Sequence, residues 1–432
     1  MNASVPPSTA PIHSESSRLD YLDATRAFAL LLGIVFHASM SFLPTFIGWA
    51  VQDVSTSPLI GMFITVSHSF RMETFFLIAG FLSYVTFHRK GAGEFVRSRV
   101  LRIVVPFAVG WFILRPLIMS GWIMGSASLR GDYDFWVGIR EGIKSLGKLP
   151  TGIFTGTHLW FLYYLAMITG LTLVLRGVLK LTGSWHIALV RRADAGVAWL
   201  ANSPFSLLVL AVPTAVALWF MRYWGMDTPD QSLLPHLPVL FIYGGGFVLG
   251  WLLGHQRELI AQFARLSPHR WILAAIGIAT IQYLNRFQLD FGHPYYQALH
   301  AAYVLGYALT MWSLVFLTIG VFKKICAQPR PWIRYLADSS YWLYLVHLPI
   351  VVWLQVAVAE VPLHWSLKLT FISVATIALA LLTYDLFVRS TWIGALLNGR
   401  RRDRAVTHLF SNVRQSSNDK QVTRSMVLES DR

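Results

Sequence analysis

A series of long apolar runs is the feature that most limits how this chain can fold. Each run is close to the ~20 residues that a helix needs to cross a bilayer. Inside hydrocarbon, only a helix or a closed barrel satisfies every backbone hydrogen bond. The sequence therefore predicts an all-α integral membrane protein, a bundle of about ten transmembrane helices. The runs lie at 27–48, 59–86, 102–121, 158–177, 205–222, 236–254, 270–288, 297–321, 339–358 and 366–388.

Composition agrees with a membrane bundle and argues against a nucleic-acid-binding protein. Only 13% of the residues are charged, against about 25% in a soluble domain. The net charge of +15 comes from basic residues in short loops between apolar runs. Membrane lipid, through its anionic headgroups, is their expected partner, and we expect no nucleic acid. Cys326 is the only cysteine, so no internal disulfide or thiolate metal site can form.

Basic side chains recur in every second loop, which predicts the topology. Lysine and arginine favour the cytoplasmic side of a membrane, so both termini are predicted to be cytoplasmic. Lys or Arg occurs in loops 88–102, 180–192, 257–270 and 323–334, and neither occurs in loops 49–58, 223–235 and 359–365.

The two ends of the chain differ in composition from the membrane domain that we place at 19–392. Residues 1–18 are polar and rich in Ser and Pro. They are expected to form a disordered cytoplasmic tail, with no cleavable signal peptide. Residues 393–432, which include Arg400, Arg401, Arg402 and Arg404, are expected to form a basic cytoplasmic tail.

The one long loop predicted outside, 122–157, contains both apolar and aromatic side chains. Phe135, Ile139, Ile143 and Leu146 recur at helical spacing, which predicts a short amphipathic helix on the outer surface. This helix would either cover the bundle or bind substrate. Aromatic rings in and beside the loop could stack on sugars or anchor the protein at the interface; they belong to Trp122, Tyr133, Trp136 and Trp160.

Three histidines lie inside predicted spans, where ionisable groups are costly and call for an explanation. His37, His68 and His347 all fall near the middle of the bilayer, at ~1.5 Å of rise per residue. One histidine alone is as easily explained by a hydrogen bond between helices. His347 is followed by Pro349, which frees a backbone carbonyl.

The first span combines a histidine with a cation on one helical stripe. Arg26 and His37 are three turns apart, so Arg26 lies at the cytoplasmic mouth and His37 ~16 Å deeper. Asp23, one turn before Arg26, is placed to hold its guanidinium. A cation at the mouth suits an anionic phosphate. A neutral imidazole at depth suits proton abstraction from a weak nucleophile.

Other spans add further polar residues. His68 and Arg71 share a face, whereas Glu73 points elsewhere. Arg99 and Arg102 form a second cationic patch, for which plain anchoring on the cytoplasmic side is an equal explanation. His158 opens the fourth span at the outer face, beside Trp160, where it is a sugar-binding or an interfacial residue.

These motifs, taken in order, resemble the acyltransferase-3 family of membrane proteins, and most closely its branch that succinylates osmoregulated periplasmic glucans. The resemblance extends from the first span to the ninth. Its segments are Leu22-Asp23-Ala24-Thr25-Arg26 with His37, His68-Ser69-Phe70-Arg71-Met72, Arg99 and Arg102, His158-Leu159-Trp160-Phe161-Leu162, and Tyr344-Leu345-Val346-His347.

The resemblance implies an enzyme of the bacterial inner (cytoplasmic) membrane. It would move an acyl group, succinyl in this branch, from cytoplasmic acyl-CoA to a hydroxyl of a periplasmic glucan, with acyl-CoA as co-substrate and no bound cofactor. In the family the first-span histidine is catalytic, and arginines on the cytoplasmic side contact acyl-CoA. The catalytic candidates are His37, His68 and His347; the acyl-CoA candidates are Asp23, Arg26, Arg71, Arg99 and Arg102; the glucan candidates are His158, Trp160 and Trp136.

Two alternatives stay open. An acetyltransferase of another cell-surface polysaccharide would use the same residues. A multi-span exporter of glucan or acyl groups would instead favour inverted repeats and interrupted helices, and the two halves of the sequence have no convincing similarity. Glu73 also departs from the uncharged residue expected in the family.

Overall fold

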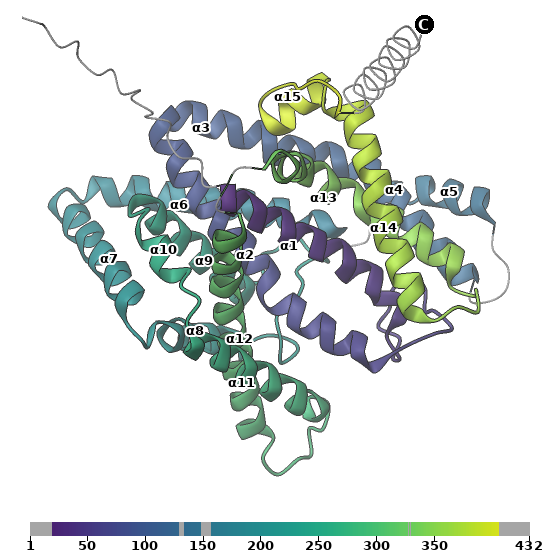
Figure 1. Ribbon diagram of the computed structural model, residues 1–432, viewed down its shortest axis with the longest axis horizontal. Helices are drawn as coiled ribbons and strands as arrows, with labels where there is room; N and C mark the ends of the chain where they lie inside the picture. Colours follow the sequence, from purple (N-terminus) through teal and green to yellow (C-terminus); the bar gives the residue numbers. More distant parts are fainter. Residues whose placement is uncertain (1–19, 129–133, 148–156, 327, 329, 406–432) are drawn as a thin grey trace, which may run out of the picture.

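The computed structural model describes residues 20–128, 134–147, 157–326, 328 and 330–405, and within them the fold is entirely helical (Figure 1). The predicted all-α fold is confirmed. The helices are α1 Asp20–Ser39, α2 Pro58–Lys90, α3 Ala92–Arg99, α4 Val105–Ser128, α5 Phe135–Lys144, α6 Trp160–Leu181, α7 Ser184–Asn202, α8 Ser206–Leu218, α9 Leu237–His255, α10 Leu259–Phe263, α11 Pro268–Leu284, α12 Tyr296–Ile325, α13 Pro331–Val358, α14 Trp365–Thr383 and α15 Trp392–Asn398.

The described residues contain eight helical segments long and apolar enough to cross a membrane, or nine if the bent pair α7–α8 is one span. The sequence predicts about ten, and two runs account for the difference. Run 205–222 forms α8, which has 13 residues and meets α7 at 115°. Run 270–288 forms α11, which has 17 residues. Both are shorter than the ~20 residues that a span needs, because hydropathy does not reveal where a helix bends or ends.

Helix α1 lies at the centre of the bundle and packs against α2, α12, α13 and α14 (Figure 1). Helix α2 is fixed in turn by a glycine-rich contact with α9. A Cβ added at Gly80 would overlap the carbonyl oxygen of Phe247, and one at Gly250 would overlap that of Leu77. Small residues that bring helix backbones together are typical of membrane bundles. The contact holds in place the helix that carries His68 and Arg71.

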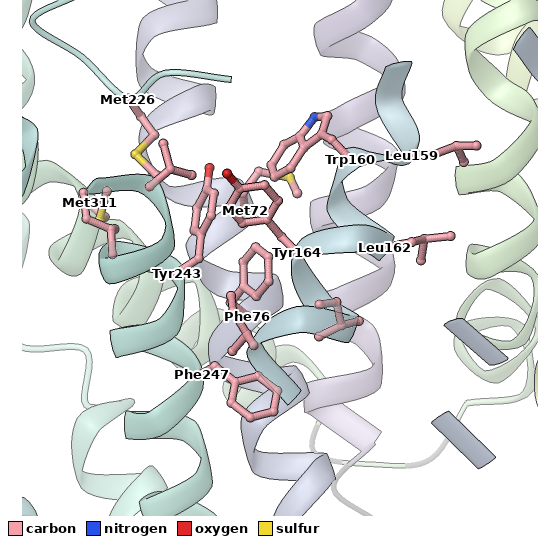
Figure 2. Close-up of a cluster of buried hydrophobic side chains, with 14 of the residues drawn as sticks. Met72, Phe76, Leu159, Trp160, Leu162, Tyr164, Met226, Tyr243, Phe247 and Met311 are labelled. Atoms are coloured by element: carbon pink, nitrogen blue, oxygen red, sulfur yellow. The ribbon is translucent and has the colours of Figure 1, made fainter. Parts of the chain in front are cut away.

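An aromatic core joins α2, α6 and α9 (Figure 2). The ring of Tyr243 stacks on Phe76 at 4.5 Å between centroids and on Trp160 at 5.8 Å. Tyr164 is fully buried beside Trp160. Since Trp160 is the first residue of α6, this packing also fixes the turn before it, which contains His158.

The segment between α1 and α2 is attached to α14 by a buried ion pair. Lys368 Nζ lies 2.7 Å from Asp53 Oδ1, and each side chain is only 1% exposed. Lys368 also donates to the carbonyl of Ala359 at 3.2 Å. Removing one partner of a buried pair typically costs about 3–5 kcal/mol. The ion pair therefore helps to hold this loop against α14, together with the hydrogen bond that Val54 N donates to the carbonyl of Ala359.

Helix α5 confirms the predicted short helix in the long loop, but its contact face differs from the expected one. Gly138 lies against Met124 and Gly142 against Ser120, both on α4, whereas the side chain of Ile143 is 57% exposed. Glycines make the contact because they let the two helix backbones come close. Tyr133 lies outside the described residues.

The chain remains packed beyond the boundary expected at 392. Helix α15 folds back onto the bundle, and α15 and α3 lie at the same end of the molecule, uppermost in Figure 1. Ala405 N donates to Asp385 Oδ1 at 2.8 Å, and Arg402 N donates to the carbonyl of Arg389 at 3.0 Å. Residues 393–405 are thus part of the folded domain rather than of a tail. The expected tail 1–18 lies outside the described residues.

Candidate active site

Three histidines from three separate elements meet in the bundle. The ring of His347, on α13, lies 5.3 Å from that of His37, at the end of α1, measured between centroids. It lies at the same distance from His158, in the turn before α6. The sequence predicts His37 and His347 at similar depth, and the structure brings them together. His158, expected at the outer face, joins them, so we call these three residues the histidine cluster.

Backbone carbonyls fix the tautomer of two of these histidine rings. A carbonyl oxygen only accepts, so the ring nitrogen facing it must donate. His347 Nδ1 faces the carbonyl of Tyr344 at 2.8 Å, and His158 Nε2 faces that of Leu345 at 3.0 Å. In the neutral rings, His347 Nε2 and His158 Nδ1 therefore carry the lone pair. Each of them is a potential proton acceptor.

The local sequence explains why His158 finds a partner there. Pro349 lacks an N–H, so the carbonyl of Leu345, four residues earlier, receives no helix hydrogen bond from it. His158 Nε2 uses that carbonyl instead. A return contact comes from Tyr344, whose hydroxyl donates to the His158 carbonyl at 2.8 Å. The predicted free carbonyl thus fixes one member of the cluster.

His37 is held in a different way. Its Nδ1 is buried and has no hydrogen-bond partner among the described residues. The ring stacks on Trp49 at 5.8 Å with 13° between the planes, and Trp122 meets Trp49 edge-on at 5.0 Å. Gln355 joins this group, because its Nε2 donates to the His37 carbonyl at 2.9 Å and its Oε1 accepts from Trp49 Nε1 at 2.9 Å.

His68 and Arg71 lie beside the cluster and not within it. Both contact the ring of Phe36, His68 by stacking at 5.6 Å and Arg71 by placing its Cζ 4.3 Å from the ring centroid. Phe36 in turn touches His37. Glu73 points to the other side, where it fills the space against Gly246 on α9. The predicted shared face of His68 and Arg71 and the separate direction of Glu73 are both confirmed.

The arginines expected at the mouth gather at the opposite end of α1. Arg26 Nη2 lies 3.4 Å from Asp23 Oδ1, which confirms the predicted i,i+3 pair. Arg99 lies within electrostatic range of both Arg26 and Arg102. Arg102 is carried by a π-helical turn, Val100–Val104, a feature common at functional sites. These three arginines form what we call the arginine mouth.

Two tryptophans predicted to bind sugar lie elsewhere. Trp160 is 8% exposed and forms part of the aromatic core (Figure 2). Trp136 is 75% exposed on α5, and its ring packs on that of Phe135. Trp49 and Gln355 were not predicted from the sequence. Gln355 nevertheless has a recognisable signal, since it is an uncharged polar residue within the ninth apolar run.

The lone cysteine shows no sign of being a nucleophile. Cys326 follows α12 and is 6% exposed. Burial raises the pKa of its thiol, with only a partial opposing effect from Arg330. The reactive thiolate is thus disfavoured. Among the described residues, no group of three His, Cys, Asp or Glu side chains is arranged to hold a metal ion.

Comparison with known proteins identifies the family. The acyltransferase-3 family, an acyltransferase domain, matches residues 19–385 of the chain. The chain belongs to this family. It is therefore a membrane acyltransferase, and the histidine cluster and the arginine mouth lie within the matched residues.

Two relatives share a name that refers to glucan biosynthesis. The chain is 24% identical over 389 residues to glucans biosynthesis protein C of Salmonella typhimurium, and 24% identical over 403 residues to the protein of that name from Escherichia coli K12. Each alignment covers 88% of this chain and 94% of the relative. No solved structure matches the chain.

Proposed function

We propose that this acyltransferase is an inner-membrane, multi-span O-acyltransferase that transfers a succinyl group from cytoplasmic acyl-CoA to a hydroxyl of a periplasmic glucan. One observation carries the proposal. The histidine cluster lies between two unlike surroundings, the arginine mouth near the start of α1 and the Trp49–Trp122 pair beyond its end. A charged donor and a sugar acceptor would need such surroundings on opposite sides of one catalytic group.

The reaction needs one proton to move from acceptor to leaving group. The acceptor hydroxyl oxygen attacks the thioester carbonyl carbon, while His37 takes the hydroxyl proton as general base. The carbon–sulfur bond then breaks, and the CoA sulfur leaves with the proton that the histidine received. The products are a glucan ester and free CoA. His347 and His158, whose rings are held by backbone carbonyls, orient the cluster and accept hydrogen bonds from the reacting groups.

The donor side of the proposal rests on the arginine mouth. Guanidinium groups match phosphate oxygens with paired hydrogen bonds. Arg99 Nε is buried without a hydrogen-bond partner among the described residues, and its guanidinium lies over Phe95. Arg26, Arg99 and Arg102 would bind the CoA phosphates, with Asp23 orienting Arg26. Arg71, beside His68, would act deeper, near the thioester.

The acceptor side rests on aromatic rings. Sugar rings stack on tryptophan faces through their apolar CH groups; Trp49 stacks on His37, and Trp122 packs edge-on against Trp49. The name of the relatives supports a glucan acceptor and does not specify the acyl group. Trp49 and Trp122 are better placed than Trp136 or Trp160 to present a glucan hydroxyl to the histidine cluster.

Purified protein in proteoliposomes provides the test. Succinyl-CoA and acetyl-CoA are supplied in parallel with a glucan acceptor, and both released CoA thiol and glucan ester are measured by mass spectrometry. We expect one CoA released per succinyl ester formed. Esters from acetyl-CoA alone would favour the polysaccharide acetyltransferase. Glucan movement across the membrane with neither CoA release nor ester would refute the proposal in favour of an exporter.

A further inference from the structure

A second group of arginines lines a pocket at the end of the molecule where α15 folds back. The pocket has a volume of about 290 Å³, close to the smallest sites that bind small molecules. Among the described residues, six line the pocket, of which four are arginines and none is acidic; they are Arg330, Pro331, Arg334, Tyr335, Arg389 and Arg402. We call it the C-terminal pocket.

Nearby carboxylates account for only part of this positive charge. Arg402 Nη2 lies 2.9 Å from Asp338 Oδ2, Arg389 Nε 3.8 Å from Asp385 Oδ1, and Arg334 Nη2 4.0 Å from Asp20 Oδ1. Arg330 has no ion pair among the described residues.

A guanidinium carries five N–H donors, so one carboxylate partner leaves most of them unused. Arg389 illustrates this. Its side chain is 14% exposed and its Nε also donates to the Asp403 carbonyl at 2.5 Å, yet its Nη1 is buried without a hydrogen-bond partner among the described residues. Buried donors are normally satisfied. The pocket thus offers N–H groups that would donate hydrogen bonds to an anion.

The C-terminal pocket adjoins the arginine mouth. Gly399, with φ of 78°, ends α15 so closely against Arg102 that a Cβ there would overlap the guanidinium. Three residues later, Arg402 lines the pocket. Segment 399–402 therefore separates two arginine groups at one end of the molecule. A ligand with phosphates at two places would contact both.

We propose that the C-terminal pocket binds phosphate groups. Two sources have this chemistry: the nucleotide end of CoA, whose 3′-phosphate is separate from its pyrophosphate, and the headgroup of an anionic phospholipid. The nucleotide source rests on the function proposed above, and the lipid source does not. Arg389 and Arg402 lie beyond residue 385, where the family match ends. The pocket is thus a feature of the C-terminal segment and not of the matched domain alone.

The experiment uses the full chain and two probes. Adenosine 3′,5′-bisphosphate, which lacks the acyl group and its arm, is titrated by calorimetry into protein in nanodiscs of uncharged lipid. Native mass spectrometry in detergent counts bound phosphatidylglycerol. The variants are Arg330→Gln and Arg402→Gln, and the matched control is Arg401→Gln, an exposed arginine of the same segment that does not line the pocket.

Loss of a charge-assisted hydrogen bond should weaken binding about tenfold or more. Weaker bisphosphate binding in Arg330→Gln and Arg402→Gln, with Arg401→Gln unchanged, would support the nucleotide source. The same pattern for phosphatidylglycerol alone would support the lipid source. Equal binding of both probes by all variants would overturn the proposal. Arg330→Gln keeps the test valid if loss of the Arg402–Asp338 pair unfolds the segment.

Failure here and failure of the proposed function are distinguishable. If the protein transfers no acyl group but binds either probe through the pocket arginines, the phosphate site is supported and the proposed function is refuted. If acyl transfer is normal and the pocket variants do not change probe binding, the phosphate site is refuted and the proposed function is supported.

Discussion

At the scale of single residues, His37 differs from the rest of the histidine cluster in how it is held, and its ring Nδ1 has no hydrogen-bond partner among the described residues. A general base needs a ring nitrogen whose lone pair faces the acceptor hydroxyl, and His37 stacks on Trp49, which we propose to bind the glucan. His347 and His158 are each fixed by a hydrogen bond to a backbone carbonyl. We therefore assign the proton transfer to His37.

Replacement of His37 by Ala should lower the rate of transfer about 10²–10⁴-fold, the usual contribution of a general base. Acyl-CoA binding and membrane folding should stay near normal. The matched control is His300→Ala, because His300 is also buried and stacks on tryptophans, Trp219 and Trp224, outside the cluster. Kinetics of purified variants provide the measurement; near-normal turnover by the His37 variant would disprove the assignment.

Gln355 should act as a positioning residue for the acceptor side. Gln355→Leu removes its hydrogen bonds to the His37 carbonyl and to Trp49, each worth about 1 kcal/mol. We expect kcat/KM for glucan to fall tenfold or more while KM for acyl-CoA stays constant. The control Gln282→Leu removes a glutamine that donates to the Met62 carbonyl, away from the cluster. An equal loss for both substrates would indicate general destabilisation instead.

Much of the cluster could be predicted from residue type and depth, and part could not. His37 and His347 were identifiable because ionisable groups are rare inside spans. The position of His158 was not, since it depends on where the turn before α6 lies relative to α13. Trp49 belongs to a loop that is attached in part by the Asp53–Lys368 pair, a contact between residues more than 300 positions apart.

At the scale of elements, replacing Pro349 in α13 should change thermal stability and activity in opposite directions. Pro349→Ala restores an N–H four residues after Leu345, which competes with His158 for that carbonyl. A proline inside a helix costs about 3 kcal/mol, so the variant should melt at a higher temperature. Transfer should nevertheless fall severalfold, because His158 loses its anchor.

The control for this experiment is Pro213→Ala in α8, a helix-interior proline outside the cluster. It should raise the melting temperature without loss of transfer. Thermal unfolding and kinetics are measured on the same preparations. If Pro349→Ala kept full activity, the proline would have no role in positioning His158.

Helices were the easiest elements to predict and their ends the hardest. Long apolar runs identify α1, α2, α12 and α13 because a helix needs about 20 apolar residues to cross hydrocarbon. The ends of α8 and α11 depend on packing partners that the local sequence does not contain. The contact face of α5 was also missed, since Gly138 and Gly142 add nothing to an apolar stripe.

At the scale of the whole molecule, the topology has the simplest test. A single cysteine at residue 140, an exposed position on α5, should react with an impermeant maleimide added outside intact cells, in a background of Cys326→Ser. The control is a cysteine at the exposed residue 89, predicted to be cytoplasmic, which should react only after permeabilisation. The reverse labelling pattern would show that the topology is the opposite of the predicted one and would refute the proposed direction of transfer.

The central position of α1 also determines the order in which the molecule can be completed during synthesis. Its neighbours α13 and α14 are the last long helices to leave the ribosome, so α1 waits in the membrane while nearly the whole chain is made. Until then His37, which lies deep in α1, lacks its neighbour His347 on α13, an unfavourable condition for a polar side chain inside a span. Chains that end before α13 should consequently be degraded by membrane proteases. Truncations that remove part of α13 or α14 should lower the amount of protein more than its specific activity.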